Sequence, residues 1–259
     1  MYDSFSSPSR KFAETSHCPK GTLVRARPRI AILGRFAEHT SATRYSAIVT
    51  ARRVAELVWQ AGGEPLTMLP VSGAAGCDWS ERLNGIDGVL MPGGGDIDPA
   101  RYGQEPSSPE LYDIDPIQDE ADLSLIQYVF EQRIPVLTIC RGTQIANVAR
   151  GGSMHQHVDE PHLHHLAEVT IEDAGGELGL AGQSVQASCY HHQALAELGA
   201  GVVPIAFAAE GYVEAVRYED AGWAYGLQWH PEDNFDTDPG QLAIVRAFIA
   251  ASAASAVRA

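Results

Sequence analysis

The sequence Pro135-Val-Leu-Thr-Ile-Cys140-Arg-Gly-Thr-Gln144 decides the fold class of this chain. It opens with a short apolar run of the kind that forms a buried strand, and a cysteine stands at the end of that run. A glycine follows at position 142, and the pattern then becomes helical. A strand that turns sharply into a helix at a nucleophilic side chain is the layout of a nucleophile elbow, here with a thiol where others carry serine. The stretch therefore predicts an α/β fold with Cys140 at the carboxyl end of a strand.

A second strand is predicted to end at a histidine, in Gly226-Leu-Gln-Trp-His230-Pro-Glu232. In an extended chain residues i and i+2 point the same way, so Glu232 can hold one ring nitrogen of His230 while the other faces a thiol. Pro231 favours the extended conformation at the residue before it. Cys140, His230 and Glu232 thus have the residue types of a nucleophile, a base and its orienter. Together they outweigh the alternative that Cys140 is a small buried apolar residue.

A catalytic thiol also needs to ionise, and it needs donors for the negative charge that develops on the substrate. The helix N-terminus after Cys140 and a nearby His230 would both favour the thiolate. The backbone N–H of Arg141 adjoins the nucleophile and is one candidate oxyanion donor. A second donor is expected from Gly93-Gly94-Gly95, where missing side chains let backbone amides approach a ligand.

Strands and helices alternate along the chain. Strands are predicted at 29–33, 64–69, 86–91 and 135–140, and helices within 42–61, 115–132 and 142–150. From about residue 167 shorter strands follow at 168–172, 202–208, 213–218 and 223–228, and a last helix at 241–254. This pattern predicts a doubly wound, mainly parallel sheet flanked by helices, with a smaller β-rich C-terminal portion of the same domain. Ligands are expected at the carboxyl ends of the strands.

Length and composition indicate one domain. The 259 residues suit a single large α/β domain over 29–259, preceded by a mobile leader at 1–28 that is rich in Ser, Pro, Lys and Arg. The formal net charge of -15 argues against a nucleic-acid partner and against an anionic membrane surface. No apolar run predicts a membrane span or a signal peptide. Four irregularly spaced cysteines form no disulfide framework, so a cytoplasmic location is expected.

Seven of the ten histidines lie between His155 and His192. Their spacing fits no standard zinc-ligand pattern and no cysteine partners them, so no metal is expected. They are interpreted as a polar loop over the active site, in which one or two histidines touch substrate. Asp96 and Asp98 follow the glycine run; they could be paired catalytic carboxylates, but capping of a turn is the preferred interpretation.

Taken together, these stretches resemble the class I glutamine amidotransferase-like superfamily and, within it, the γ-glutamyl-γ-aminobutyrate hydrolase family, over roughly residues 29–250. The motifs that carry the resemblance are Met91-Pro-Gly-Gly-Gly-Asp-Ile-Asp-Pro99 with Tyr102-Gly103, Ile139-Cys-Arg-Gly-Thr-Gln144, Asn147 through Gly151-Gly-Ser-Met-His-Gln156, Tyr190-His-His-Gln193 and Gln228-Trp-His-Pro-Glu232.

The resemblance implies a role for each matching residue. It makes Cys140 the nucleophile, His230 the base and Glu232 its orienter. It also implies oxyanion donors at Gly94 and Arg141 and substrate contacts from Gln144, Tyr190 and His191. Two positions depart from the family pattern: Thr138 replaces a smaller residue before the elbow, and Ser188-Cys189 stands where Asn-Ser is expected.

The expected function is therefore a cysteine hydrolase that cleaves the side-chain amide of a γ-glutamyl amine through a thioester and releases glutamate and the amine. The substrate is a small molecule, no cofactor is expected, and a homo-oligomeric state stays open. One alternative is a glutaminase subunit that delivers ammonia to a separate synthetase. A second alternative is a non-catalytic binding protein on the same fold.

Overall fold

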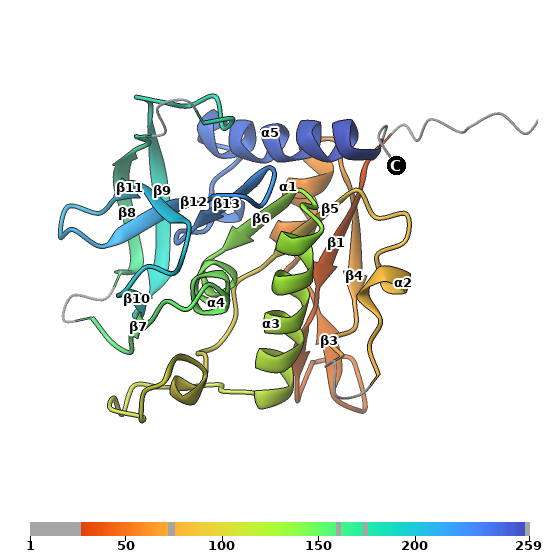
Figure 1. Ribbon diagram of the computed structural model, residues 1–259, viewed down its shortest axis with the longest axis vertical. Coiled ribbons are helices and arrows are strands. Elements are labelled where there is room, and N and C mark those ends of the chain that lie inside the picture. The colour runs from red at the N-terminus through yellow and green to blue at the C-terminus, as the bar shows by residue number, and fades with distance from the viewer. Residues whose placement is uncertain (1–26, 72–75, 159–161, 173–175, 257–259) are drawn as a thin grey trace, which may run out of the picture.

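The computed structural model describes residues 27–71, 76–158, 162–172 and 176–256, so the predicted leader lies outside the described residues up to position 26. Its centre is a seven-stranded sheet in the order β11-β12-β13-β6-β5-β1-β4 (Figure 1). The five strands from β13 to β4 run parallel, and β12 and β11 add antiparallel partners at one edge. The strands are β1 (Arg29–Leu33), β4 (Glu64–Met68), β5 (Gly88–Met91), β6 (Val136–Ile139), β11 (Val202–Phe207), β12 (Val213–Tyr218) and β13 (Ala224–Leu227).

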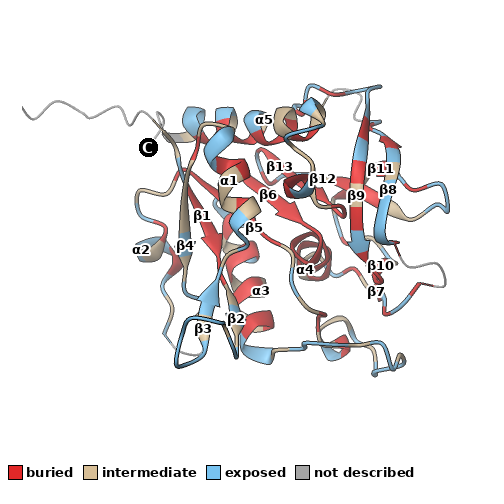
Figure 2. Ribbon diagram, turned by 180° about the vertical axis from the view of Figure 1, so that it is seen from behind, coloured by how far each residue is buried: buried red, intermediate tan, exposed pale blue. Residues whose placement is uncertain are grey.

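Helices cover both faces of the sheet. Ile30 and Ile32 of β1 belong to a core that includes α1 and α5, whereas Ala31 and Leu33 pack with α3 and α4. Successive residues of a strand point to opposite faces, so this division shows a doubly wound arrangement. Every residue of β5, β6 and β13 is buried, as a parallel sheet covered on both faces requires (Figure 2). The helices are α1 (Arg52–Gln60), α2 (Trp79–Arg82), α3 (Pro116–Glu131), α4 (Arg141–Ala149) and α5 (Pro239–Ala256), with short 3-10 turns η2 (Pro99–Tyr102) and η3 (Pro231–Asp233).

The predicted fold class is confirmed, but the predicted helix within 42–61 is too long. The helix begins only at Arg52, and β2 (Arg35–Ala37) and β3 (Ala47–Val49) form an antiparallel hairpin before it. Ile48 fits the helical spacing of the following apolar residues, yet it lies in β3 and packs over Gly34 of the hairpin. Its side chain is 41% exposed, so it does not take part in the core that fixes α1.

The histidine-rich stretch is also more regular than predicted. His162, His164 and His165 lie in β8 (His162–Thr170), and His191 ends β9 (Ser184–His191). These two strands form a separate antiparallel ribbon, so the prediction of a loop is wrong for this part. The strand predicted at 168–172 overlaps the end of β8. Two further strands, β7 (Met154–His155) and β10 (Ala194–Leu195), pair with each other. The remaining predicted elements are present with nearly the same bounds.

No helix within the described ranges is long and apolar enough to cross a membrane.

Candidate active site

The turn at Cys140 is a strained elbow between β6 and α4. Cys140 has φ 50° and ψ -111°, a conformation that residues with a side chain rarely adopt. Three hydrogen bonds hold it: its N–H donates to the carbonyl of Leu227 at 2.7 Å, and its carbonyl accepts from the N–H groups of Thr143 and Gln144 at 2.9 and 3.2 Å. A Cβ on Gly142 would lie 2.8 Å from Cβ of Met91 in β5, so the tight turn needs glycine there. The predicted strand–turn–helix is confirmed.

His230 follows β13, the parallel neighbour of β6, and therefore meets Cys140 at the same edge of the sheet. A Cβ on Gly93 would lie 2.9 Å from His230 Cε1 and 3.6 Å from Cys140 Cβ, so both side chains border this glycine. The His230 backbone N–H donates to the carbonyl of Ser188 at 2.8 Å. Its Nδ1 lies 2.7 Å from Oε1 of Glu232, which is 5% exposed.

The charge state of His230 follows from these neighbours. Burial lowers the pKa of its imidazole, but the Cys140 thiolate and then Glu232 raise it more, so the pKa ends well above its usual value. His230 Nε2 is buried and has no hydrogen-bond partner of ordinary geometry among the described residues. A proton on Nε2 is therefore available to Cys140 or to a ligand beside it.

An arginine that the sequence reasoning missed shapes the glycine run. Arg35 donates through Nε to the carbonyl of Gly93 at 2.8 Å and through a guanidinium nitrogen to the carbonyl of Pro92 at 2.6 Å. Because the carbonyls of Pro92 and Gly93 face Arg35, the N–H groups of the glycine run that follows can point away from Arg35. The N–H groups of Gly94 and Arg141 have no hydrogen-bond acceptor in the part of the chain that the structure describes.

Arg35 is itself held by a buried ion-pair cluster on α3. It forms an ion pair with Asp122 at 2.7 Å, and the side chain of Arg141 pairs with Asp122 and, at 2.5 Å, with Asp119. Burial alone would raise the pKa of Asp122, but Arg35 and Arg141 lower it below its usual value. The contacts join residues from β2, α3 and α4, and no local sequence pattern marks them.

A pocket of about 340 Å³ opens beside Cys140. It brings together most of the predicted site residues, namely Gly94, Cys140, Gln144, Tyr190, His191 and His230. Glu232 is not among them because it lies behind His230, and Arg141 is not because its side chain pairs with Asp119 and Asp122. Gln144 is buried, and its amide lies 3.4 Å from Gln228 Oε1. Tyr190 is 47% exposed, so it forms the rim of the pocket.

The two carboxylates after the glycine run have different positions. Asp98 caps η2, because its side chain accepts from the N–H of Ala100 at 3.0 Å, as predicted for a turn. Asp96 does not cap this turn: it accepts from the N–H of Tyr112, 16 residues away, at 3.0 Å, lines the pocket and lies 3.1 Å from Nε2 of His192. Burial is the largest cause of a raised pKa at Asp96.

Both departures from the family pattern have structural roles. The Thr138 hydroxyl forms hydrogen bonds with Thr143 at 2.9 Å and Tyr218 at 3.1 Å, which link β6, α4 and β12. Ser188 donates through Oγ to Asp233 at 2.8 Å, next to the carbonyl that fixes His230.

Cys189 lies in a buried cluster with His162, His191 and Glu214. The premise that no cysteine accompanies the histidines is therefore wrong: the pairing of β8 with β9 brings Cys189 close to His162, which is distant in sequence. The predicted substrate residue His191 has its imidazole within this cluster as well as at the pocket wall.

Comparison with known proteins places this architecture in a family. Residues 28–232 match the sequence model of the Peptidase C26 family. The chain is 37% identical over 164 residues to the Mycobacterium tuberculosis protein named "Putative glutamine amidotransferase Rv2859c", covering 60% of this chain and 53% of that protein. It thus spans about half the length of this relative. It is 33% identical over 196 residues to the gamma-glutamyl-gamma-aminobutyrate hydrolase PuuD of Escherichia coli K12, covering 67% of this chain and 74% of that protein.

A solved glutamine amidotransferase from Thermotoga maritima has a similar fold, with a TM-score of 0.59 at 13% identity, covering 88% of this chain and 99% of that one. The family match covers most of the chain, and the fold agrees with it. The chain therefore belongs to the Peptidase C26 family, which is class I glutamine amidotransferase-like.

Proposed function

We propose that this protein hydrolyses the γ-glutamyl amide bond of a γ-glutamyl amine. One observation carries the proposal: Cys140 and His230 meet around Gly93, and Glu232 lies behind the imidazole at 2.7 Å. This is the arrangement in which a base activates a nucleophile and an acid orients the base. The similarity to proteins named gamma-glutamyl-gamma-aminobutyrate hydrolase supports the choice of bond.

In the first half of the reaction, the Cys140 thiolate attacks the γ-carbonyl carbon of the substrate. The negative charge on the carbonyl oxygen is stabilised by the N–H groups of Gly94 and Arg141, which have no acceptor within the described residues. Protonated His230 then donates the proton on Nε2 to the leaving amine, and the C–N bond breaks. The product is a γ-glutamyl thioester on Cys140.

In the second half, neutral His230 takes a proton from water, which attacks the thioester carbonyl carbon. The carbon–sulfur bond breaks, glutamate leaves, and the pair of Cys140 thiolate and protonated His230 is restored. Gln144 lines the pocket beside the thiol and is proposed to contact the γ-glutamyl group, with Tyr190 and the backbone of His191 toward its α-amino-acid end.

The pocket lining favours a positively charged leaving amine. Asp96 and Asp113 both line the pocket, and its described lining residues include no lysine or arginine. A γ-glutamyl diamine keeps one free ammonium group after conjugation, and these carboxylates can pair with it. We therefore propose a polyamine conjugate as the preferred substrate.

The experiment is a panel of γ-glutamyl amides scored for glutamate release by the purified protein: the putrescine, γ-aminobutyrate and ethanolamine conjugates, and glutamine. At least one conjugate should be hydrolysed without any partner, and it should be preferred to glutamine because the leaving side is bound too. Two relatives carry the name glutamine amidotransferase, so an ammonia-delivering subunit is the second candidate. Glutamine cleaved only after a synthetase is added would favour that candidate, and no turnover in any assay would favour a non-catalytic binding protein.

A further inference from the structure

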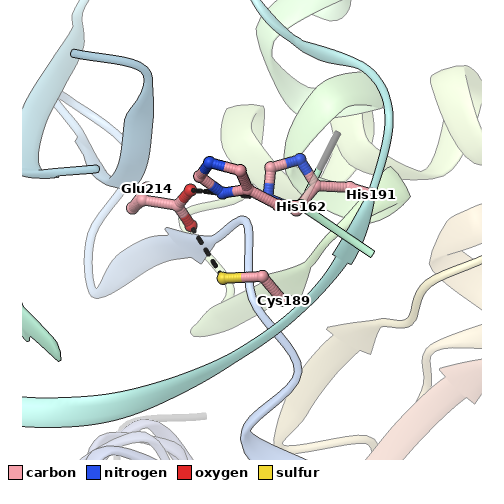
Figure 3. Close-up of side chains that lie close together, drawn as sticks. All are labelled: His162, Cys189, His191 and Glu214. Carbon is pink, nitrogen blue, oxygen red and sulfur yellow. Dashed lines mark hydrogen bonds and ion pairs between the residues drawn. The ribbon is translucent and has the colours of Figure 1, made fainter. Parts of the chain in front are cut away.

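The buried cluster beside the pocket joins three strands. His162 begins β8, Cys189 and His191 stand near the end of β9, and Glu214 lies in β12 of the central sheet. One ligand atom from each residue lies within 4.8 Å of the others, and Figure 3 shows both rings and the thiol gathered around the Glu214 carboxylate. None of the four side chains belongs to the elbow or to the His230 segment.

The imidazole of His191 is oriented as a metal ligand would be. Its Nδ1 lies 3.0 Å from the carbonyl of Gln193, an acceptor, so Nδ1 carries the proton. The lone pair is therefore on Nε2, which is 3.4 Å from Oε1 of Glu214 and has no hydrogen-bond partner of ordinary geometry among the described residues. His191 is only 4% exposed. A metal-ligating histidine commonly donates its other N–H to a backbone carbonyl in this way.

His162 differs from His191. Its Nδ1 donates to Oε1 of Glu214 at 3.1 Å, and its Nε2, which has no hydrogen-bond partner of ordinary geometry among the described residues, lies 3.3 Å from Oε2 of Glu210. On metal binding Nδ1 would exchange its bond to Glu214 for the ion, and the ring proton would stay on Nε2 beside Glu210. Cys189 is fully buried, with Sγ 4.0 Å from Oε2 of Glu214.

We propose that His162, Cys189, His191 and Glu214 form a structural zinc site. Two imidazoles, a thiolate and a carboxylate are ligands that zinc takes, and four protein ligands close a tetrahedral site. Bonds of about 2.0–2.3 Å place tetrahedral ligand atoms roughly 3.3–3.8 Å apart, so the widest pair in the cluster would close by about 1 Å on binding.

Charge balance supports a divalent ion. The thiolate and the carboxylate each carry one negative charge and the two imidazoles are neutral, so a Zn²⁺ ion makes the buried site neutral overall. In the metal-free protein, burial and the adjacent Glu214 raise the pKa of the Cys189 thiol, and Glu214 raises the pKa of His162. A zinc-bound thiolate has lost its proton, so binding at this site would be favoured by higher pH.

The site would fasten the β8–β9 ribbon to the central sheet through β12. β9 supplies Tyr190 and His191 to the pocket wall and, through the carbonyl of Ser188, holds the backbone of His230. The zinc would fix one wall of the pocket and take no part in bond cleavage.

The experiment measures zinc by elemental analysis in protein stripped with chelator, dialysed and reloaded with zinc chloride. All samples carry Cys140→Ala, so that the active-site thiol cannot bind the ion. About one tightly held zinc per chain is expected. Substitution by cobalt should give the intense visible bands of a tetrahedral ion and a thiolate charge-transfer band.

Matched variants locate the ion. Cys189→Ser should remove the charge-transfer band and most of the zinc, and His162→Gln should reduce zinc content at least tenfold. Two controls should keep full zinc content: His165→Gln, an exposed histidine of the same strand, and Cys77→Ser, a half-buried cysteine outside the cluster.

No stoichiometric zinc in reloaded protein, or the same zinc content in Cys189→Ser, would overturn the proposal and leave the cluster as a metal-free His–Glu network. Circular dichroism shows whether each variant is folded. If a variant does not fold, the zinc content of the protein with all four ligands intact decides whether the proposal holds.

Discussion

Replacing Glu232 with glutamine removes one negative charge from the proposed triad but keeps an oxygen that can accept the hydrogen bond from His230 Nδ1. The wild-type distance is 2.7 Å, with the two side chains 14% and 7% exposed, so solvent screens the interaction little. A hydrogen bond to a charged group contributes about 1.5–3 kcal/mol and a neutral one about 0.5–1.5 kcal/mol. The substitution therefore costs the protonated imidazole about 1–1.5 kcal/mol, which is about one pKa unit.

The sign of the pH effect follows from this loss. The charge of Glu232 helps to raise the pKa of His230, so Glu232→Gln lowers it. In the proposed mechanism protonated His230 is the acid that protonates the leaving amine, and this acid form is lost at lower pH in the variant. The alkaline limb of the kcat/KM profile should move toward lower pH by about one unit. Above this limb kcat/KM should fall by about tenfold relative to wild type, and at neutral pH the fall should be smaller unless the amide turns its NH₂ group toward Nδ1 and holds the wrong tautomer.

The assay is glutamate release from the best γ-glutamyl amide, measured across the pH range for wild type and Glu232→Gln. Asp233→Asn is the control, because it removes a neighbouring charge whose carboxylate contacts Ser188. An alkaline limb that stays in place in Glu232→Gln, or that moves equally in Asp233→Asn, would refute the assignment of Glu232 as the partner of His230.

Three further results are expected. Cys140→Ala should lower turnover by several powers of ten, on the order of what loss of one triad member causes, whereas Cys77→Ser should keep near-normal glutamate release. Arg35→Met should lower kcat by about 10²-fold with a smaller change in KM, because the carbonyls beside the oxyanion donors lose their anchor; near-normal kcat in folded protein would contradict this role. Thr138→Val should cost about 1–3 kcal/mol of unfolding free energy in denaturant titration, because the buried hydroxyl of Tyr218 loses its Thr138 partner, and an unchanged midpoint would exclude this contribution.

The sheet and the elbow could be predicted because their signals are local. Residues 136–139 read as a continuous apolar run because the strand is buried on both faces, and Gly142 marks the turn. His230 and Glu232 are two residues apart, so their contact follows from strand geometry alone. The β2–β3 hairpin has no such signal: its strands are three residues long, largely exposed, and carry no alternation long enough to distinguish them from a helix.

The parts that were missed depend on contacts between distant segments. Arg35 matters because α3 places Asp122 beside it, 87 residues along the chain. The cluster of His162, Cys189 and Glu214 is assembled by the pairing of β8 with β9 and the approach of β12, so no ligand spacing exists to be recognised. Short-range metal motifs describe sites built on one turn or one helix.

The β8–β9 ribbon is separate from the parallel sheet that holds Cys140 and His230, so it can be anchored independently of that sheet. Cys140 and His230 are fixed by β6 and β13, whose positions follow from the core of the parallel sheet. Tyr190 and His191 belong to a ribbon outside that sheet, which needs its own anchor. Because β9 also carries the carbonyl that binds the His230 backbone, loosening the ribbon would move both the substrate wall and the base. A structural ion at the junction of β8, β9 and β12 would therefore affect both substrate binding and the alignment of His230.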